Sequence, residues 1–317
     1  MTADAITLSI STPEGLIAAV PNVLGFHPHE SIVVITVTAE HSLGVTLRIP
    51  LDTDPDTILD ALNSVTETGI ATAMVVVVGP GAAADHEPAY RTVRSALEGN
   101  GVVVAAGLWA QATTGNQRWS SYDNPALHGT TSDSSATLLS AELAMRGLRV
   151  HDSIHELAAL LAPEPADVLR ARGHQAAALA EDGHTGDVND LVRLVEQTAA
   201  DPAAPLTMDL PRLALALTAR DAPNVCATLV VEGHGRAVEH VMTLLARGLP
   251  DRFRACAAAL AALAAYDNGN GAFARLCVEA ALEADPAHML AQLMNAVIAS
   301  SFPPHELRKL LHEAVAA

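Results

Sequence analysis

The stretch PNVLGFHPHESIVVITV, residues 21–37, decides how the first part of the chain is interpreted. Its second half is an almost uninterrupted β-branched run, which is typical of a strand buried on both faces. Its first half contains Gly25, which permits unusual backbone dihedral angles, and Pro28, which fixes one. We therefore predict a tight, solvent-facing turn over residues 27–30 that leads into a buried strand over residues 31–38.

Strand and helix signals alternate on both sides of this stretch. Near-continuous Val and Ile runs separated by helical segments imply an α/β domain, with a mixed, partly parallel sheet and helices on both faces. Phe26 is expected to anchor the turn in the core, and strands should be confined to about residues 5–125. We expect strands at residues 6–10, 31–38, 43–51, 72–78, 102–109 and 118–122, with helices at 12–20, 54–68 and 87–98.

From residue 137 to the end, apolar residues recur at three- and four-residue spacing, which predicts helices only. The expected organisation is an α/β domain over residues 1–135 and an all-α domain over residues 136–317. Residues 252–311 of the second domain look like one unit of a tetratricopeptide-like array.

Composition limits the classes of partner. The net charge of −18 repels phosphate backbones and anionic lipids, so we expect neither nucleic acid nor a membrane surface as a partner. The chain begins without a signal-peptide pattern, and its apolar runs are too short to span a bilayer, so a soluble, cytoplasmic protein is expected. Cys226, Cys256 and Cys277 each lie in an apolar helical pattern, which predicts three reduced core thiols.

Four segments carry a resemblance to a known family. They are LIAAVPNVLGFHPHESIVVI at residues 16–35, VTLRIPLD at 45–52, RWSSYDNP at 118–125 and GAFARLCVEAALEADPAHMLAQLM at 271–294. Over nearly its whole length the chain resembles DUF4192, an actinobacterial family of unknown function, so the resemblance implies architecture and little chemistry. Relatives carry cysteines in the loop after the Trp-Ser segment, including an adjacent pair. Residues 123–129 contain none, which implies that any metal or redox role of those thiols is lost here.

Two loops of the expected α/β domain gather charged and aromatic residues. Two imidazoles and a carboxylate in the first loop could hold zinc or iron, with Asp52 or His41 as a further ligand. Histidines two residues apart are common in loops, so we expect no metal and a turn that matters first for structure. The candidate ligand-binding residues are His27, His29, Glu30, Arg48, Asp52, Trp119 and Tyr122.

Arg48 lies in an apolar strand, where a charged side chain needs a partner. We expect an ion pair with Glu30 or Asp52. The functional alternative is an anion-binding arginine in a cleft.

The sequence VVVVGPGAAAD, residues 75–85, fits the dinucleotide-binding pattern G-x-G-x-x-A. A phosphate site there requires a helix that begins at once. Pro80 interrupts the turn, and the helix is expected to start only near Pro88. Asp85 and Glu87 place negative charge where phosphate would lie, so we reject a dinucleotide site.

The sequence HDSIH, residues 151–155, imitates the H-E-x-x-H zinc motif. Ser153 and Glu156 form a capping box, which should start the helix at Ser153 and leave His151 outside it. We therefore reject zinc hydrolysis at this motif.

Two function classes remain. No complete catalytic constellation is present, which favours a non-catalytic protein-interaction or regulatory protein that presents an acidic surface to a protein partner. Such a protein needs no cofactor, and a homo-oligomer is compatible with it. The alternative is a small-molecule or nucleotide-binding enzyme, with a cleft lined by residues 27–30, Arg48 and residues 119–122.

Overall fold

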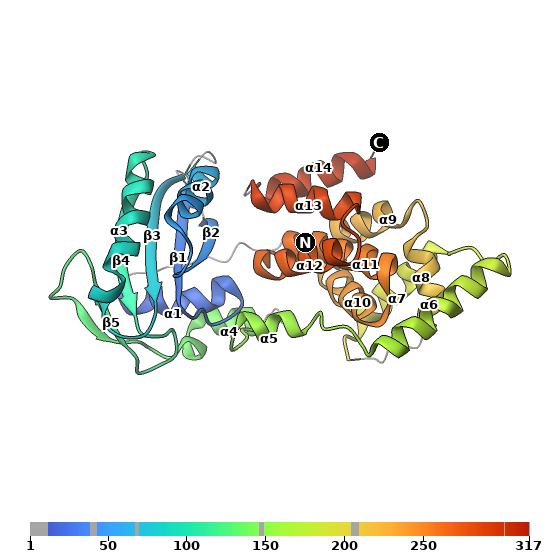
Figure 1. The fold of residues 1–317 in the computed structure, drawn as a ribbon, viewed down its shortest axis with the longest axis horizontal. Helices are drawn as coiled ribbons and strands as arrows, with labels where there is room; N and C mark the ends of the chain where they lie inside the picture. The colour runs from blue at the N-terminus through green and yellow to red at the C-terminus, as the bar shows by residue number, and fades with distance from the viewer. Residues whose placement is uncertain are drawn as a thin grey trace. The chain divides into compact units, whose positions relative to one another are not determined.

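The computed structural model in Figure 1 describes residues 12–38, 43–66, 70–145, 149–203, 209–300 and 302–316. The strand expected at residues 6–10 lies outside the described residues. The chain divides into two compact units, Met1–Glu156 and Leu157–Ala317. The change of sequence character at residue 135, from which we predicted the domain boundary, lies inside the first unit.

A six-stranded mixed sheet forms the centre of the first unit, in the order β2-β1-β3-β4-β5-β6. The pair β3 and β4 is parallel, and the other neighbouring strands are antiparallel. This confirms the prediction of a mixed, partly parallel sheet. The strands are β1 (Ser31–Thr38), β2 (Leu43–Pro50), β3 (Ile70–Val78), β4 (Val103–Ala110), β5 (Arg118–Ser121) and β6 (His128–Thr130).

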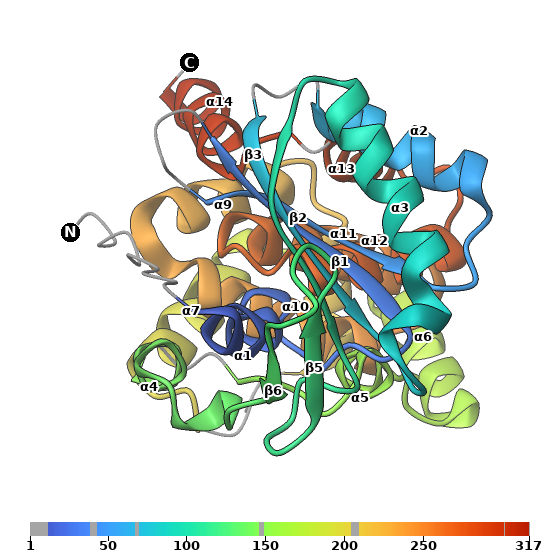
Figure 2. The same ribbon diagram turned by 90° about the vertical axis from the view of Figure 1, so that its left-hand side faces the viewer.

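Helices cover the sheet on both sides. Helices α2 (Pro55–Thr66) and α3 (Ala83–Gly99) lie on one side, and Figure 2 shows α1 (Pro13–Leu24) on the opposite side. Leu62 of α2 and Val93 of α3 belong to one buried apolar cluster with alternate residues of β1 and β3. The first unit continues through η1 (Ser134–Ala136) and α4 (Leu138–Met145) to the first turn of α5 (Ile154–Ala159).

The buried strand predicted from the opening stretch is β1, which forms an antiparallel hairpin with β2. It also pairs along its length with β3, so both of its edges are hydrogen-bonded. The side chains of Ile32, Val33, Val34 and Ile35 are fully buried, and Phe26 is 1% exposed. The β-branched run therefore fills the space between the helices on the two faces of the sheet.

Two helix boundaries differ from the prediction because a proline lies inside each helix. α1 continues past residue 20 to Leu24, with Pro21 within it, and ends at Gly25, which has the left-handed φ of 79°. α3 begins at Ala83 and not near Pro88. A proline inside a helix removes one backbone hydrogen bond, and tertiary packing of the apolar face outweighs that loss here.

Two pairings lie beyond the range 5–125 in which strands were expected. The short strand β6 pairs with β5 in a segment that we predicted to be a loop. His151 forms an isolated bridge with Phe26, in which His27 N donates to His151 O at 2.9 Å and His151 N donates to Gly25 O at 2.9 Å. The expected limit at residue 125 was therefore wrong, since these pairings are too short to leave a periodic pattern in the sequence.

The second unit contains helices and no strand among its described residues, as predicted. The helix α11 (Asp251–Asp267) contacts both α10 (Gly235–Gly248) and α12 (Gly271–Ala284). Its alanines are almost all fully buried, and small side chains let neighbouring helices approach closely. The other helices are α6 (Ala166–Glu181), α7 (Val188–Ala200), α8 (Leu210–Leu217), α9 (Ala222–Leu229), the π-helix η2 (Val230–His234), α13 (Met289–Ala299) and α14 (Pro304–Ala316).

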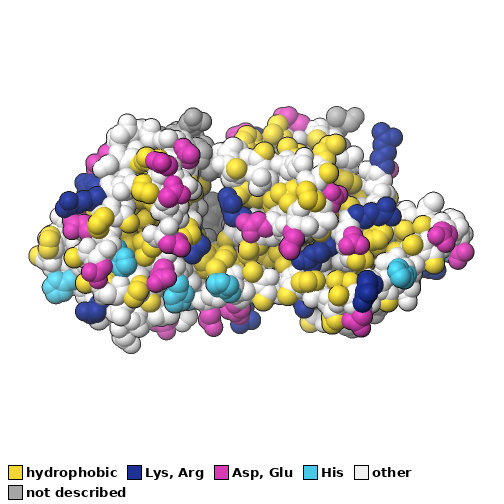
Figure 3. All heavy atoms as spheres, in the orientation of Figure 1, with side chains coloured by type: hydrophobic (Ala, Val, Ile, Leu, Met, Phe, Trp, Pro, Cys, Tyr) yellow, Lys and Arg dark blue, Asp and Glu magenta, His cyan; other side chains and the backbone are white. Residues whose placement is uncertain are grey.

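All three cysteines are free thiols in helices of this unit, as predicted. Among the helices that the structure describes, none is long and apolar enough to cross a membrane. On the face shown in Figure 3, acidic side chains are scattered among apolar and uncharged ones.

Candidate functional site

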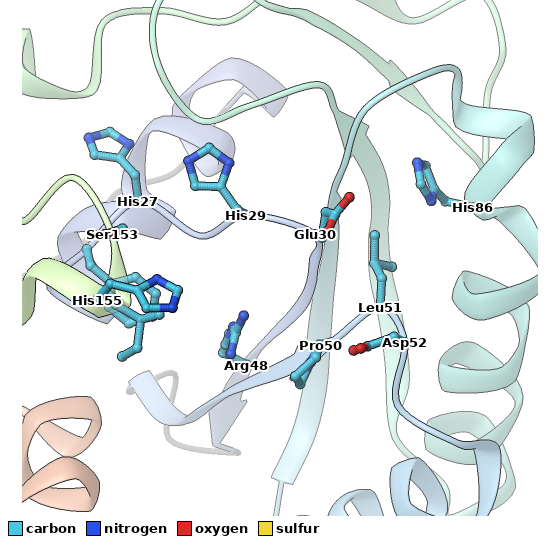
Figure 4. Close-up of a pocket in the computed structure, with 12 residues that line it drawn as sticks. His27, His29, Glu30, Arg48, Pro50, Leu51, Asp52, His86, Ser153 and His155 are labelled. Atoms are coloured by element: carbon cyan, nitrogen blue, oxygen red, sulfur yellow. The ribbon is translucent and has the colours of Figure 1, made fainter. Parts of the chain in front are cut away.

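A pocket of about 490 Å³ opens in the first unit, where the chain enters β1 and leaves β2 (Figure 4). It brings together five of the seven candidate residues, which come from two separate stretches of the sequence, residues 27–30 and 48–52. The lining residues are Phe26, His27, His29, Glu30, Arg48, Pro50, Leu51, Asp52, His86, Ser153, Ile154 and His155.

The turn before β1 forms one wall of this pocket. Glu30 adopts a left-handed backbone conformation, with φ of 42°. For a residue other than glycine this conformation is strained by about 1–3 kcal/mol, and such strain clusters at ligand sites. The carbonyl of Glu30 accepts a hydrogen bond from Leu51 N at 2.8 Å, which helps to hold this conformation and ties the turn to the end of β2.

Arg48 extends into the pocket from the edge strand β2. In the β1–β2 register Arg48 lies opposite Val33, while its neighbour Ile49 lies opposite Ile32 in the core on the other face. Arg48 Nε donates to Ser31 Oγ at 2.8 Å, and that hydroxyl donates to His29 O at 2.5 Å. The guanidinium is therefore positioned by the start of β1.

The ion pair that we expected for Arg48 does not form. No carboxylate of the described residues lies within ion-pair distance of its guanidinium, although Glu30 and Asp52 line the same pocket. Its two terminal nitrogens likewise have no hydrogen-bond acceptor in the described part of the chain. Burial lowers the pKa of Arg48, and the charge of Asp52 opposes this effect. A half-buried guanidinium with open donors is suited to an oxyanion.

His27 is half-buried, so the prediction of a fully solvent-facing turn is wrong at this residue. The bridge from its backbone to His151 draws the turn against that segment. Its ring Nδ1 shares a hydrogen bond of 2.8 Å with the hydroxyl of Thr113, which is buried. Burial lowers the pKa of His27, Asp152 and Asp133 oppose this, and His29 adds to it. His27 therefore connects the turn to the loop after β4.

His86 and His155 also line the pocket, although neither was predicted as a site residue. His86 lies in α3 and donates from Nε2 to Pro80 O at 2.7 Å, so a neutral ring presents Nδ1 as an acceptor. His155 lies at the start of α5 and was considered only as part of HDSIH. Neither residue carries a local signal, because each is brought to the pocket by helix placement.

Trp119 and Tyr122 lie elsewhere in the first unit. Trp119 is 3% exposed and pairs through β5 with Ala110. Tyr122 stacks on Tyr90 with ring centroids 4.2 Å apart, and its hydroxyl donates to Ala83 O at 3.2 Å. Neither side chain lines the pocket. Their aromatic rings pack against the sheet. Aromatic residues in a loop give the same sequence pattern whether they pack in the core or bind a ligand, so the sequence does not separate the two roles.

The pocket does not gather a metal-ligand set. Across the described ranges, no three His, Cys, Asp or Glu side chains are placed so that they could hold a metal ion. His41, which we considered as a further ligand, lies outside the described residues.

The two rejected motifs have clear local structures. α3 begins directly after the Gly79–Gly81 turn, so the helix start near Pro88 was wrong. Asp85 Oδ2 accepts from Ala82 N at 2.8 Å, and a carboxylate therefore occupies the position that a phosphate would need. Ahead of α5, Glu156 N donates to Ser153 Oγ at 3.2 Å and Glu156 Oε2 accepts from Asp152 N at 2.7 Å. The Ser153 half of the predicted capping box is confirmed, whereas the Glu156 carboxylate bonds Asp152 N in place of Ser153 N. His151 lies before the helix, as predicted.

Comparison with known proteins identifies a family. Residues 13–305 match the family described as Domain of unknown function (DUF4192). The chain belongs to the DUF4192 family. No curated protein and no solved structure matches it. The candidate site of this DUF4192 chain therefore has to be interpreted from its own geometry, and two of the segments that suggested the family, residues 16–35 and 45–52, supply five of its charged and imidazole side chains.

Proposed function

We propose that the protein is a small-molecule-binding protein whose ligand presents a carboxylate or phosphate group to Arg48. One observation carries this proposal. The Arg48 guanidinium is fixed through Nε by Ser31, and its terminal nitrogens face a pocket without an acceptor from the described residues. An arginine with a free planar fork binds an oxyanion through two parallel hydrogen bonds.

The charge of the first unit supports the same function. Residues 1–156 contain 6 basic and 17 acidic side chains. Arg91, Arg94 and Arg149 each pair with a carboxylate, and the side chain of Arg118 donates to the uncharged acceptors Gln111 Oε1 and Gly81 O. Among the described residues Arg48 has no carboxylate partner, although carboxylates line its pocket, and this arrangement is expected of a binding residue and not of a structural ion pair.

We propose binding without catalysis. His27 shares a hydrogen bond with the hydroxyl of Thr113. Thr113 is buried and does not line the pocket. This hydrogen bond holds two loops together, so it does not activate a nucleophile toward a ligand. The protein-interaction role inferred from the acidic charge and the helical second half stays a prediction, and the pocket gives ligand binding the more specific support.

The proposal is tested by thermal unfolding in the presence of millimolar amino acids, dicarboxylates and nucleoside monophosphates. Tryptophan fluorescence is the readout, because both tryptophans, Trp109 and Trp119, lie buried in the first unit. A bound ligand should raise the unfolding temperature of the parent protein. Arg48→Gln should abolish that shift, whereas Arg91→Gln, which makes the same charge change at an exposed ion pair, should keep it. A shift that survives in Arg48→Gln, or no shift with any compound, would overturn the proposal.

A further inference from the structure

The polar groups of the Arg48 pocket are arranged by chemical type. Figure 4 shows Arg48 and His155 toward the α5 side of the pocket, and Glu30, Asp52 and His86 toward the α3 side. The α5 side offers the open guanidinium donors of Arg48. The α3 side offers two carboxylates and, from a neutral His86, the Nδ1 acceptor left by its bond to Pro80. The pocket therefore has a donor end and an acceptor end.

We infer that the ligand is a zwitterion, with an oxyanion at Arg48 and a protonated amine between Glu30 and Asp52. This inference rests on the proposed function and adds the second charged group of the ligand. An ammonium group is matched by carboxylates and by a neutral imidazole nitrogen, all of which accept hydrogen bonds. Small amino acids and related amino carboxylates form the chemical class that carries both groups.

The charge balance of the pocket favours a zwitterion over a simple anion. Leaving the imidazoles aside, the lining carries one guanidinium and two carboxylates, so it is negative before any ligand enters. The chain as a whole has a net charge of −18, which repels an approaching anion. A zwitterion has no net charge, and each of its ends meets a group of opposite sign. A monoanion would satisfy Arg48 and leave Glu30 and Asp52 facing the new negative charge.

The backbone conformation of Glu30 also helps to form the acceptor end of the pocket. Glu30 is one of three non-glycine residues with positive φ in the described part of the chain, and it is the one that lines this pocket. The Leu51 bond that holds its conformation connects it to the segment that carries Asp52. One backbone connection between the start of β1 and the end of β2 thus places both acidic residues along the pocket wall.

The test compares matched compounds that differ only in charge. Calorimetric titration of the full chain would use 4-aminobutyrate, butyrate and butylamine, and the same three functional patterns at chain lengths from two to six carbons. At the best length the zwitterion should bind at least about tenfold more tightly than either singly charged compound, which corresponds to one well-placed charge pair. Arg48→Gln should abolish binding. Arg48→Lys should weaken it, because lysine keeps the positive charge but loses the two parallel N–H donors of the guanidinium.

Variants of the acceptor end separate this inference from the proposed function. In the double variant Glu30→Gln and Asp52→Asn the zwitterion should lose its advantage, so that it and the monoanion bind with similar affinity. The control variant Asp60→Asn and Glu98→Gln, with the same charge change on exposed helix positions, should keep the preference. Arg48-dependent binding of monoanions as tight as that of zwitterions would overturn the zwitterion and leave the proposed function standing. Absence of Arg48-dependent binding for every compound of this series overturns the zwitterion, and its absence also for the carboxylates and phosphates of the thermal screen overturns both.

Discussion

At the scale of single residues, Phe26 is the anchor of the turn that leads into β1. Its side chain is 1% exposed, and its backbone forms the bridge to His151. Phe26→Ala should lower the free energy of unfolding of the first unit by about 3–5 kcal/mol, the usual cost of truncating a buried phenylalanine. Urea unfolding followed by tryptophan fluorescence measures this change. His29→Ala, at an exposed position of the same turn, should stay within about 0.5 kcal/mol. Equal losses in the two variants would show that Phe26 does not anchor the turn.

His27 should make stability depend on pH. Burial lowers its pKa below the ordinary value of 6.5, so below that pH the unfolded chain binds more protons than the native protein. The contribution of His27 is therefore fully present above pH ~6.5 and is lost as the pH falls toward the lowered native pKa. Fluorescence-monitored urea unfolding at pH ~7.5 and pH ~5.5 should show a smaller loss in His27→Gln than in the parent. The same pH dependence in both proteins would exclude this role.

At the scale of secondary-structure elements, one carboxylate joins a helix to two strands. Asp123, just after β5, accepts from Gly107 N of β4 at 2.8 Å and from the Tyr90 hydroxyl of α3 at 3.1 Å, and it pairs with Arg94. Burial raises the pKa of Tyr90, and the charge of Asp123 adds to this effect. The tyrosine therefore stays a hydrogen-bond donor to the carboxylate.

This arrangement requires glycine at position 107. A Cβ atom there would lie 2.1 Å from the Tyr90 hydroxyl oxygen, so the tyrosine would have to move away from Asp123. Gly107→Ala should lower the free energy of unfolding by about 1–3 kcal/mol, as overpacking usually does. The matched variant Gly99→Ala places its Cβ where no atom lies within 4 Å, at the end of α3, and should be neutral or slightly stabilising. A neutral Gly107→Ala in the same unfolding assay would show that the contact is not important for stability.

At the scale of the whole molecule, the three thiols report on the packing of the second unit. Cys226 and Cys277 are fully buried, and burial raises the pKa of Cys226 to about 12. Burial likewise raises the pKa of Cys277 well above its ordinary value, with the charge of Glu239 adding to the effect. A thiol-specific reagent should therefore leave these two unmodified in the native protein, since only the thiolate reacts. In denaturant without reductant it should count three thiols. A count of one would reveal a disulfide and contradict the structure.

Local sequence patterns specified the fold class and most of the helices and strands, but they missed β6 and the ends of α1 and α3. The length and β-branched composition of residues 31–38 favour a strand covered on both faces, and the three-to-four-residue apolar spacing after residue 137 favours helices. Both patterns are local consequences of side-chain shape and solvent exclusion, so they can be read without knowing the fold. The cap at Ser153 and the left-handed Gly25 were predictable for the same reason, because each depends on neighbouring residues alone.

Only the tertiary structure decided which of the candidate residues share a site. It brought His27, Glu30 and Arg48 into one pocket, added His86 and His155 from two helices, and placed Trp119 and Tyr122 in the packing of the sheet. It also left the half-buried Arg48 without a carboxylate partner among the described residues, although such a charge is normally paired. Contacts between residues far apart in the chain depend on strand order, register and helix placement. Strand order, register and helix placement are set by the packing of the whole unit, so they cannot be predicted from short sequence patterns.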